Sequence, residues 1–600
     1  MIIPMKKITL FVNETRKQEA LNKLREFGAL HVKFIQEPVS SDISALEKEL
    51  AKAENALRTV NNIEEEPQGN GNSSKSSSEI VSEILSMNEE KDELQEQLLE
   101  ERGKLVWFHI WGDVQKKDIY DLRENNVYIR LYEVDNNRLE ELQEEYPVFV
   151  IKEGKAISYI ALISNNEEDQ LDQKEIMPPE ESMQEAKESI EKIENRIEEI
   201  NKNLLANKNN IDKIESYIEK LENKLEYARV SEGMAAESSV AYLQGFCPEE
   251  MIDDFKKKAK NENWGYVIQN PDNPNEVPTK LSDTKSKKLV EPIYNFMGTL
   301  PGYTEYDISS LFLIFFAVFV GMIVGDAGYG LIYLGLTIFA RKKMPDAPKD
   351  TFQLFYILSG ATIVWGLITG TIFGAPALQN IVPFKYLIID PIKNFAKTDN
   401  TPLIMFITFV VGAIQLTFGH IMQLKRNLGS PKFLAQVGWI VIVWAMLFVS
   451  EQIVLGGEVV QGAVSMNVIG YAVLAGSVLV LLFENYKKGK IFKGMAQTIG
   501  NLPMDVIGAF SDIVSYIRLF AVGLATVVIE QSFNSMAIGD GIESISGFII
   551  AAVILFLGHS LNLILAVMSI VVHGIRLNML EFSTHLGMTW SGKEYKPFKE

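Results

Sequence analysis

The chain has 600 residues, of which 23% are charged, and a formal net charge of -20. This length indicates more than one domain, and the acidic excess argues against a nucleic-acid partner. The lone cysteine, Cys247, excludes an internal disulfide and a cysteine metal cluster.

The two halves of the chain differ in composition. Residues 1–300 are rich in Glu, Lys and Asn, whereas residues 301–600 are long apolar runs separated by short polar loops. The alternating charges of the first half are typical of solvated helices. We therefore expect a mainly α protein with a cytoplasmic arm over residues 1–300 and a membrane domain over residues 301–600. The apolar part of the opening MIIPMKKITLF is too short for a signal peptide, and charged residues follow it too early. We therefore expect the N-terminus to stay on the side of the membrane where the chain is synthesised.

The arm is expected to contain two small α/β lobes joined by coiled-coil helices. The pattern of residues 5–37 predicts a strand, a helix ending at Gly28 and a strand, in a lobe over about 1–40. Apolar residues three and four apart predict coiled coil over about 41–104 and 180–230. Short strands and helices are expected in a second lobe over about 105–165. Residues 231–300 should return to the first lobe.

Two features interrupt the coiled-coil pattern. Residues 64–79 form a low-complexity loop, and Asn207 occupies a core position of the later run, where a polar residue would fix the register. The simplest interpretation of the heptad pattern is that the coiled-coil helices act as a spacer. Neither a GxxxxGK[ST] motif nor a Rossmann glycine fingerprint occurs, so we expect no nucleotide or other cofactor here.

Eight membrane spans are expected, because about 20 apolar residues cross a bilayer. They lie near residues 309–324, 327–340, 353–374, 402–422, 434–455, 465–484, 498–533 and 546–580. The last two are longer than a perpendicular crossing needs, which predicts tilt or extension beyond the bilayer.

The distribution of basic residues predicts the topology. Eight spans place the clusters at 341–343, 425–427 and 487–493 on one side, and the loops 456–464 and 534–545 on the other side carry no Lys or Arg. The loop 375–400 contains lysines and fits less well. The positive-inside rule favours a multi-pass protein of the cell membrane with both ends in the cytoplasm.

Two arginines, Arg518 and Arg576, stand within the last two spans. A charge at mid-bilayer costs about 2.5–3.5 kcal/mol on insertion scales, so it usually faces a bundle interior or a watery pathway. Snorkelling requires a position near a span end, which fits Arg576 better than Arg518. A structural ion pair with Glu451 or Glu530 is a further alternative.

Polar side chains share helix faces with both arginines. At α-helical spacing, one stripe contains His559, Asn562, Ser569, His573 and Arg576, and another contains Ser511, Ser515 and Arg518. Asp505 and Asp512 lie two turns apart and are rotated away from Arg518. The stripes predict the walls of aqueous half-channels, with the arginines at the barrier between them.

An arginine barrier has a definite chemistry. A guanidinium stays charged and pairs with carboxylates, so it would ionise a carboxyl group on a moving partner and expel the cation bound there. Histidine could relay protons along such a stripe. For His573, simple packing is an equal alternative.

Several motifs resemble the membrane-embedded stator subunit of V-type and A-type rotary ATPases, called subunit a or subunit I. They are VSYIRLFAVGLA, GHSLNLILAVMSIVVHGIRLNMLEF with the tail YKPF, and FVGMIVGDAGYGLIY, together with YLQGFCPEE and GALHVKF in the arm. The similarity covers essentially the whole chain. Two motifs, MGTLPGYTEYD and FVGMIVGD, differ from the sequences that are more usual at these places in the family. Neither motif includes Arg518 or Arg576. The length and the short loop at 457–466 resemble prokaryotic members.

The resemblance implies eight spans beside a proteolipid ring, whose carboxylates release H⁺ or Na⁺ opposite Arg518 and Arg576. His573 would be the polar partner of Arg576, and Asp505 and Glu581 would be acidic positions of the half-channels. The arm would hold peripheral-stalk subunits of the E/G type at its lobes and approach the central-stalk cap of the C/d type. ATP chemistry would lie in other chains, so this chain would be no enzyme on its own.

Two other classes of protein remain open from the residues alone. A secondary transporter with a coiled-coil arm usually shows internal repeats, and none is visible between the first and last four spans. A structural tether with a membrane anchor would leave the polar stripes unexplained. The choice of H⁺ or Na⁺ and the direction of work depend on other chains.

Overall fold

The computed structural model describes residues 2–63, 75–237, 239–345, 347–375, 386–393, 400–460, 464–487, 491–539, 541 and 544–599. It is mainly helical, as predicted, and divides into two compact units. One unit comprises Met1–Leu10, Phe27–His31 and Gly245–Lys599, and the other comprises Phe11–Glu26 and Val32–Gln244. Most of the low-complexity loop expected at 64–79 lies outside the described residues.

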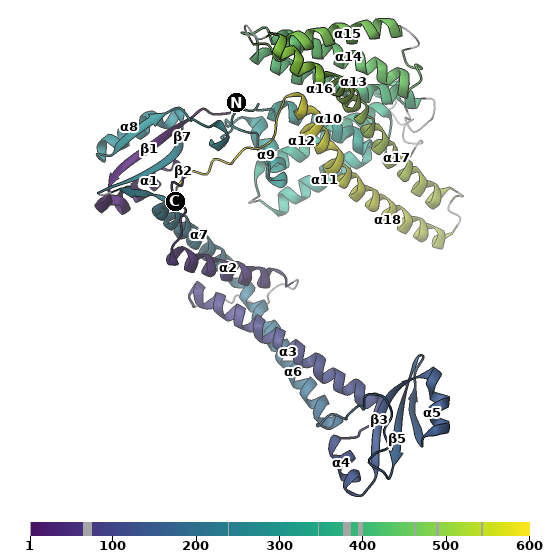
Figure 1. Ribbon diagram of the computed structural model, residues 1–600. Coiled ribbons are helices and arrows are strands. Elements are labelled where there is room, and N and C mark those ends of the chain that lie inside the picture. The colour runs from purple at the N-terminus through teal and green to yellow at the C-terminus, as the bar shows by residue number, and fades with distance from the viewer. Residues whose placement is uncertain are drawn as a thin grey trace. The chain divides into compact units, whose positions relative to one another are not determined.

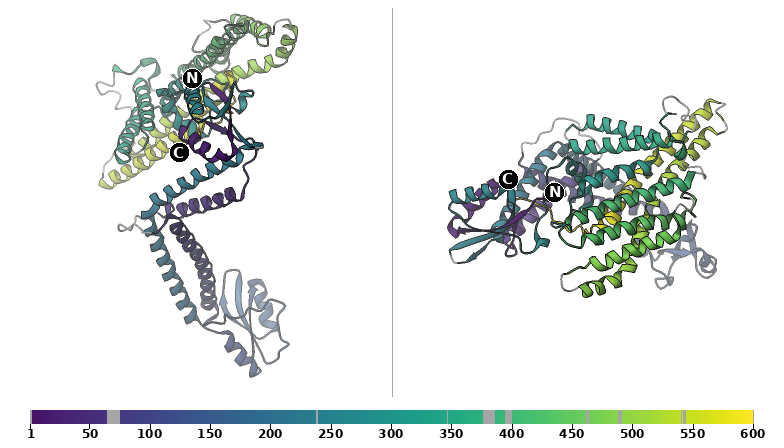
Figure 2. Two further views of the ribbon diagram at one scale, coloured as in Figure 1. Left: turned by 90° about the vertical axis from the view of Figure 1, so that its left-hand side faces the viewer. Right: turned by 90° about the horizontal axis from the view of Figure 1, so that it is seen from above.

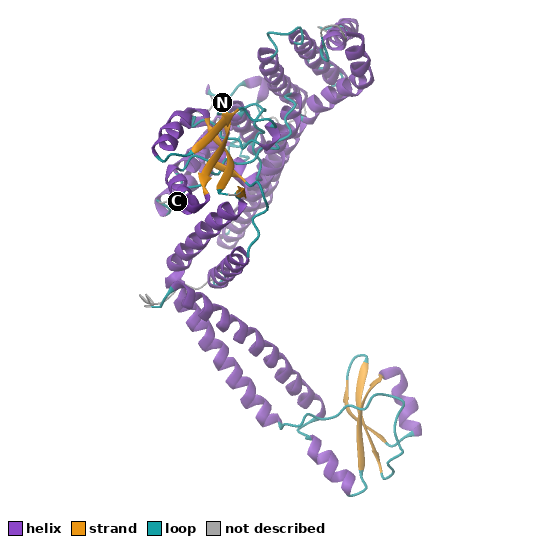
Figure 3. Cartoon of the chain, turned by 60° about the vertical axis from the view of Figure 1, so that its left-hand side comes forward, coloured by secondary structure: helices purple, strands orange, loops and turns teal. Residues whose placement is uncertain are grey.

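Two pairs of long helices build most of the second unit (Figures 1 and 3). Helix α2 (Ser41–Asn61) packs along α7 (Ile211–Gly233), and α3 (Ser77–Trp111) packs along α6 (Met183–Ala206). The three-four spacing places apolar residues on the facing sides, which confirms the predicted coiled-coil helices. The core between the helices contains Ala53, Ala56, Val60, Ile80, Ile84, Ile200, Leu204, Ile214 and Leu221.

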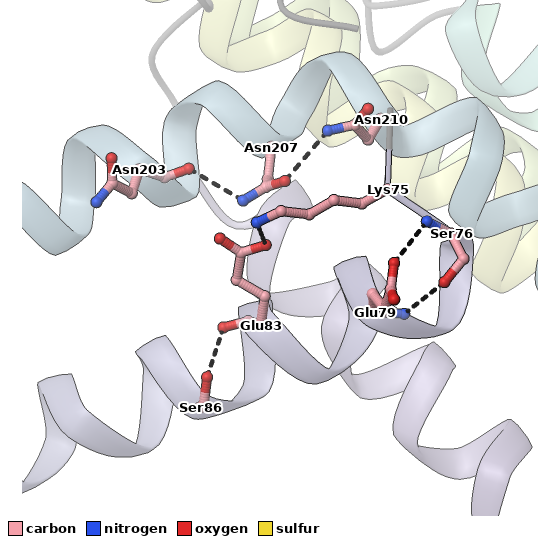
Figure 4. Close-up of polar contacts among 8 residues, drawn as sticks. All are labelled: Lys75, Ser76, Glu79, Glu83, Ser86, Asn203, Asn207 and Asn210. Atoms are coloured by element: carbon pink, nitrogen blue, oxygen red, sulfur yellow. Dashed lines mark hydrogen bonds and ion pairs between the residues drawn. The ribbon is translucent and has the colours of Figure 1, made fainter. Parts of the chain in front are cut away.

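Asn207 does not occupy a core position, so that prediction is wrong. The heptad run breaks there into α6, a 3₁₀ turn over Asn207–Asn210, and α7. The Asn207 amide donates to the Asn203 carbonyl at 3.2 Å, and Asn210, which is buried, donates to the Asn207 side chain at 3.1 Å (Figure 4). Asparagine competes for backbone hydrogen bonds and therefore favours helix ends over helix interiors.

Capping boxes fix the starts of α3 and α6. The Ser76 hydroxyl accepts from the backbone of Glu79 at 3.4 Å, and the Glu79 carboxylate accepts from the backbone of Ser76 at 2.9 Å (Figure 4). Ser182 and Glu185 form the same reciprocal pair at the start of α6. Two orphan donors are thereby satisfied at each end. The backbone hydrogen bond from Ser76 lowers the pKa of the Glu79 carboxyl, because it favours the charged form.

The second α/β lobe is a small antiparallel sheet with two short helices. Strands β3 (Tyr128–Asp135), β5 (Ile157–Ser164) and β4 (Val148–Glu153) pair in the order β3-β5-β4, with Tyr132 opposite Ile160. Helices α4 (Lys116–Glu124) and α5 (Leu139–Glu145) accompany the sheet (Figure 3). Alternating residues supply its core, which includes Tyr132, Val134, Leu142, Ile160 and Leu162.

The first lobe contains a sheet of order β2-β7-β1-β8. The strands are β1 (Met5–Asn13), β2 (His31–Lys33), β7 (Val240–Pro248) and β8 (Gly265–Gln269), and β6 (Ala235–Glu237) pairs with β7. Helices α1 (Lys17–Phe27) and α8 (Ile252–Asn261) follow β1 and β7 along the chain. The last residues of the chain reach β2, where the Lys596 backbone donates to His31 Nδ1 at 3.1 Å.

Apolar helices occupy all eight segments in which spans were predicted (Figures 1 and 2). A connecting helix, α9, precedes them. The bounds are α9 (Lys285–Met297), α10 (Ser309–Val324), α11 (Ala327–Lys343), α12 (Lys349–Thr369), α13 (Thr401–Arg426), α14 (Phe433–Val454), α15 (Met466–Phe483), α16 (Ile491–Ser515), α17 (Ile517–Ile538) and α18 (Ile545–Ser569).

The number of complete spans differs from the expected eight. Six helical stretches in the described residues are long and apolar enough to cross a membrane, or seven if the bent pair α10–α11 is one span. This pair turns by 119° at Gly325 and Asp326, and its helices have 16 and 17 residues. At 1.5 Å per residue each reaches roughly 25 Å, short of a bilayer core of about 30 Å.

The last two stretches are long, as predicted. Residues Phe492–Ile538 form one apolar stretch of 47 residues, and Ile545–His585 form another of 41 residues. The first is divided at Tyr516 into α16 and α17. The second continues from α18 through two π-helical segments, η10 (Ile570–Gly574) and η11 (Leu577–Phe582).

We predict that the only thiol, Cys247, reacts slowly in the native protein. It lies fully buried in β7, and burial raises the pKa of its thiol to about 12. Since the thiolate is the reactive form, alkylation should be slower by on the order of a thousandfold than after denaturation. Iodoacetamide labelling followed by mass spectrometry measures this rate. An exposed cysteine at Lys257→Cys is the control, and equal rates at both positions would contradict the prediction.

Candidate functional site

The two membrane arginines converge on one carboxylate. Arg518 stands near the start of α17, and its Nη2 lies 3.6 Å from Glu581 Oε1. Arg576 stands between η10 and η11, and its Nε lies 3.7 Å from the same oxygen. The Glu581 side chain is 7% exposed, whereas those of Arg518 and Arg576 are 24% and 53% exposed. The carboxylate is therefore the buried centre of the cluster.

The π-helical segments bring Arg576 and Glu581 to one side of the helix. In an α-helix, residues five apart are rotated by roughly 140° from each other. In a π-helix the hydrogen bonds join residues five apart, so such residues lie above one another. Arg576 and Glu581 are separated by this interval, and η11 contains Glu581. The wider local turn therefore makes the pair possible.

The cluster leaves polar atoms without partners. Arg518 Nη1, Glu581 Oε2 and His573 Nδ1 are buried, and no hydrogen-bond partner for them exists among the described residues. Two cations face one anion, and both ion-pair distances exceed a charge-assisted hydrogen bond of about 2.8 Å. An additional anionic or polar group would complete the site.

A histidine pair extends from one end of this cluster, at α13, α16 and the last turn of the chain's final helix. His585 Nε2 lies 2.9 Å from Asp512 Oδ2, and His585 Nδ1 lies 3.0 Å from His420 Nε2. His420 Nδ1 lies 2.9 Å from Gln436. These groups line a pocket of about 390 Å³ with mixed polar and apolar walls, which Asp505 also lines. Asp505 and Asp512 thus open into the same hollow.

A buried polar bridge joins α13, the break at Tyr516 and the π-helical segment. The Tyr516 hydroxyl donates to Gln415 Oε1 at 2.7 Å, and the Gln415 amide donates to Asn578 Oδ1 at 2.8 Å. All three side chains are completely buried. Because each polar atom in this chain of bonds has a partner, the bridge holds the helices in one arrangement.

A second polar cluster lies toward the other ends of α17 and α18. The Tyr329 hydroxyl contacts His559 Nδ1 at 2.8 Å and accepts from the Asn562 amide at 3.1 Å. Asn562 also donates to the Thr526 carbonyl at 2.9 Å, and His559 Nε2 lies 3.2 Å from Asn534 Oδ1. These contacts connect the bent pair with both long helices.

Two buried carboxyl groups belong to this second cluster. Asp326, at the bend, accepts from the backbone of Tyr329 at 3.1 Å and of Gly374 at 3.2 Å. Glu530 on α17 is fully buried and interacts electrostatically with Asp326. Neither Glu530 oxygen has a hydrogen-bond donor in the described part of the chain. Asp326 is fully buried too, so the two residues form a buried acidic pair.

The structure brings some of the residues predicted from the sequence together and places others apart. Arg518, Arg576 and Glu581 come together, and the partner of Arg518 is Glu581, not Glu451 or Glu530. Glu451 instead accepts from backbone groups after α14. The Ser515 hydroxyl donates to the Asp512 carbonyl at 2.7 Å, so it serves its own helix.

The α-helical stripe on the last helix is divided between two places. His559 and Asn562 belong to the Tyr329 cluster, whereas His573 and Arg576 lie at the π-helical segments. Sequence reasoning missed several residues of both clusters, although each is a polar residue in an apolar segment. They are Asp326, Tyr329, Gln415, His420, Asn578 and His585.

Comparison with known proteins finds relatives of one kind. The V-type ATP synthase subunit I of Borreliella burgdorferi is 30% identical over 635 residues, and the alignment covers 100% of both chains. V-type ATP synthase subunit I 1 of Treponema pallidum is 27% identical over 630 residues, again over 100% of both chains.

Among solved structures, the cytoplasmic N-terminal domain of a subunit I, described as a homologue of subunit a of V-ATPase, covers 44% of this chain and 100% of its own. Its identity is 14% and its TM-score is 0.25, too low for a structural argument. No family model matches the chain.

We predict that Tyr516→Phe lowers the stability of the protein. Loss of the hydroxyl leaves buried Gln415 Oε1 without its donor, which costs about 1–3 kcal/mol. The thermal unfolding midpoint in detergent should therefore fall. Tyr471→Phe, at a position 74% exposed, is the matched control and should leave the midpoint unchanged. Equal midpoints for the two variants would show that the bridge contributes no stability.

Proposed function

Because the chain belongs to the subunit I family of V-type and A-type ATP synthases, and is thus a multi-pass membrane subunit of a rotary ATPase complex, we propose that it carries ions past Arg518 and Arg576. The observation that supports this proposal is the incomplete charge cluster. Two guanidinium groups share the single Glu581 carboxylate, and buried atoms of Arg518 and Glu581 lack partners. Membership of this family removes the transporter and the tether as alternatives.

In the proposed mechanism, the missing anionic group is a carboxylate on a moving proteolipid ring. When a ring carboxyl group reaches the site, the guanidinium groups favour its ionised form. The carboxyl group then releases H⁺ or Na⁺ and pairs transiently with Arg518 or Arg576. The excess positive charge at the site also repels cations, so an ion cannot leak directly from one side to the other.

The two polar clusters are suited to be the half-channels. Asp512, on α16, precedes Arg518 in the chain, and Glu530 follows Arg518 on α17 by twelve residues, or roughly 18 Å of helix. Along the last helix, His559 and His585 lie on opposite sides of Arg576 in the same way. We infer that ions enter or leave through the His420–His585–Asp512 pocket on one side and the Asp326–Glu530 cluster on the other.

The proposed role also has consequences for the partners of this chain. We propose that the two α/β lobes hold peripheral-stalk subunits of the E/G type and that the arm approaches a central-stalk cap of the C/d type. ATP hydrolysis or synthesis takes place in other chains of the complex, so this chain acts as a non-catalytic stator.

We predict that Arg518→Ala uncouples the complex without dissociating it. Loss of one charge-assisted contact with the ring carboxylate should slow ATP-driven ion uptake about tenfold to a hundredfold. Uptake is measured in vesicles containing the purified complex, with subunit composition and ATP hydrolysis measured in the same preparation. Lys493→Ala, an exposed basic residue of the membrane domain, is the control. If the Arg518 variant takes up as many ions per ATP hydrolysed as the unmodified complex, the proposed role of Arg518 is wrong.

We predict that the C-terminal tail and the loop before α14 lie on the cytoplasmic side. If α10 and α11 both cross or both re-enter, the number of crossings is even and both chain ends share a side. If the pair crosses only once, the ends lie on opposite sides. In either arrangement the three basic clusters and the C-terminal tail share one face, and the positive-inside rule makes that face cytoplasmic.

Single cysteines in a Cys247→Ser background test this topology. Lys593→Cys and Leu428→Cys should react with an impermeant maleimide in inverted vesicles, whereas Ile545→Cys, 84% exposed at the start of α18, should react in right-side-out vesicles. Reaction of Lys593→Cys on the same side as Ile545→Cys would contradict the prediction.

A further inference from the structure

A large apolar cavity lies on the membrane unit away from the arginine cluster. It has a volume of about 650 Å³, within the range of small-molecule sites. Helices α9, α10, α11 and α12 form most of its wall, and the last helix closes it around η10. Representative lining residues are Ile293, Phe316, Leu336, Phe355, Val567 and Val571.

Five polar side chains line the wall, and three of them have hydrogen-bond partners within the protein; Thr351 and Ser359 are the other two. The Thr337 hydroxyl donates to the Tyr333 carbonyl at 2.7 Å, and Thr362 donates to Leu358 at 3.0 Å. The Tyr333 hydroxyl donates to the Leu563 carbonyl at 3.0 Å. Since these donors are satisfied within the protein, the cavity offers an almost purely apolar lining. A polar metabolite would lose its hydration there without compensation.

Basic side chains stand at one end of the cavity. Ala340 and Met344 line it, and Arg341, Lys342 and Lys343 lie between them at the end of α11. All three are exposed, and no carboxylate of the described residues lies within ion-pair distance of them. Residues 341–350 contain four basic and two acidic side chains, so the segment has a positive excess.

We propose that this cavity binds an anionic phospholipid, with an acyl chain in the apolar wall and the phosphate at Arg341, Lys342 and Lys343. The two halves of the site match the two halves of such a lipid. Apolar cavity residues such as Leu336 and Phe355 remain 57% and 48% exposed in this chain, as expected for a site that opens to acyl chains. Basic clusters at the end of a span attract anionic headgroups.

The bound lipid would act as a packing element behind the ion site. Ile570 and Ile575 line the cavity, and the π-helical segment between them contains His573. An acyl chain against these side chains would support the face of the helix opposite the arginine cluster. The site would thereby couple membrane composition to the position of Arg576.

The experiment uses the intact complex in vesicles of phosphatidylcholine that contain a photoactivatable phosphatidylglycerol. After irradiation, mass spectrometry locates the labelled peptides. A photoactivatable phosphatidylcholine, tested in the same way, reports lipids that are held by the apolar wall alone. The proposal expects labelling of cavity residues, with preference for phosphatidylglycerol.

Two pairs of variants distinguish the headgroup contacts from the cavity. Lys342→Gln with Lys343→Gln removes two cations near the surface and should reduce the preference for phosphatidylglycerol about 30-fold. Lys425→Gln with Lys493→Gln removes two cations elsewhere and should leave it intact. Ala340→Trp fills the cavity and should abolish labelling with both lipids, whereas Ile338→Trp, an exposed position of the same helix outside the lining, should not.

Each outcome decides the proposal. Equal labelling by the two lipids would mean an ordinary boundary lipid and would overturn it. Labelling of another subunit in place of the cavity residues would show that protein covers this surface, which would also overturn it. Loss of labelling in the Ile338→Trp variant to the same degree as in Ala340→Trp would show that the cavity is not the site.

Discussion

The shared contact of two guanidinium groups with one buried carboxylate is the constraint on which the membrane unit depends. An ion taken from water into a low dielectric is tolerated only with close partners, and removal of one partner leaves an uncompensated charge. Glu581 is the only anion within ion-pair distance of Arg518 and Arg576 among the described residues. The surrounding helices must therefore hold α17 and the last helix at a fixed separation. The Gln415–Tyr516–Asn578 bridge supplies part of that restraint. Gly412 allows α13 to approach, because a Cβ atom there would lie 2.5 Å from the Tyr516 ring.

The polar residues around this constraint are arranged in short, separate networks. The His420–His585–Asp512 contacts and the Tyr329–His559–Asn562 contacts lie on opposite sides of the arginines along the helices. Between them the helices pack through apolar residues such as Phe319 and Leu519, which are fully buried. A continuous hydrogen-bonded path would conduct protons without a rotor. Here the two polar networks are separated by the arginines and by apolar packing. This arrangement suits an ion path in which a moving carboxyl group of another subunit must carry the ion from one network to the other.

The sequence predicts the parts of this protein whose cause is local. Heptad spacing predicts the paired helices, strand alternation predicts both lobes, and the arginines in apolar segments mark the site. Prediction from the sequence fails where a residue's position depends on irregular backbone or on contacts between segments far apart in the chain. Asn207 ends a helix because its neighbours form a 3₁₀ turn, and α-helical spacing cannot place Glu581 beside Arg576 when the backbone is π-helical. Gln415, His420 and His585 are brought to the site by packing between segments far apart in the chain, which periodicity does not encode.

The π-helical segments have a consequence for how this region can change by insertion and deletion. Each π-type hydrogen bond encloses one residue more than an α-type bond. Deletion of a single residue between positions 570 and 582 could therefore be absorbed by a return to regular α-helix. Because the π-helical turn already holds one residue more than an α-helical turn, the side chains beyond the deletion would face nearly the same way as before. Arg576 and Glu581 would then be four residues apart in an α-helix, where they differ by only about 40° and still lie above one another. A one-residue gap between them would thus preserve the charge cluster, whereas a one-residue gap in a regular α-helical part of the same helix would turn every following side chain by about 100°.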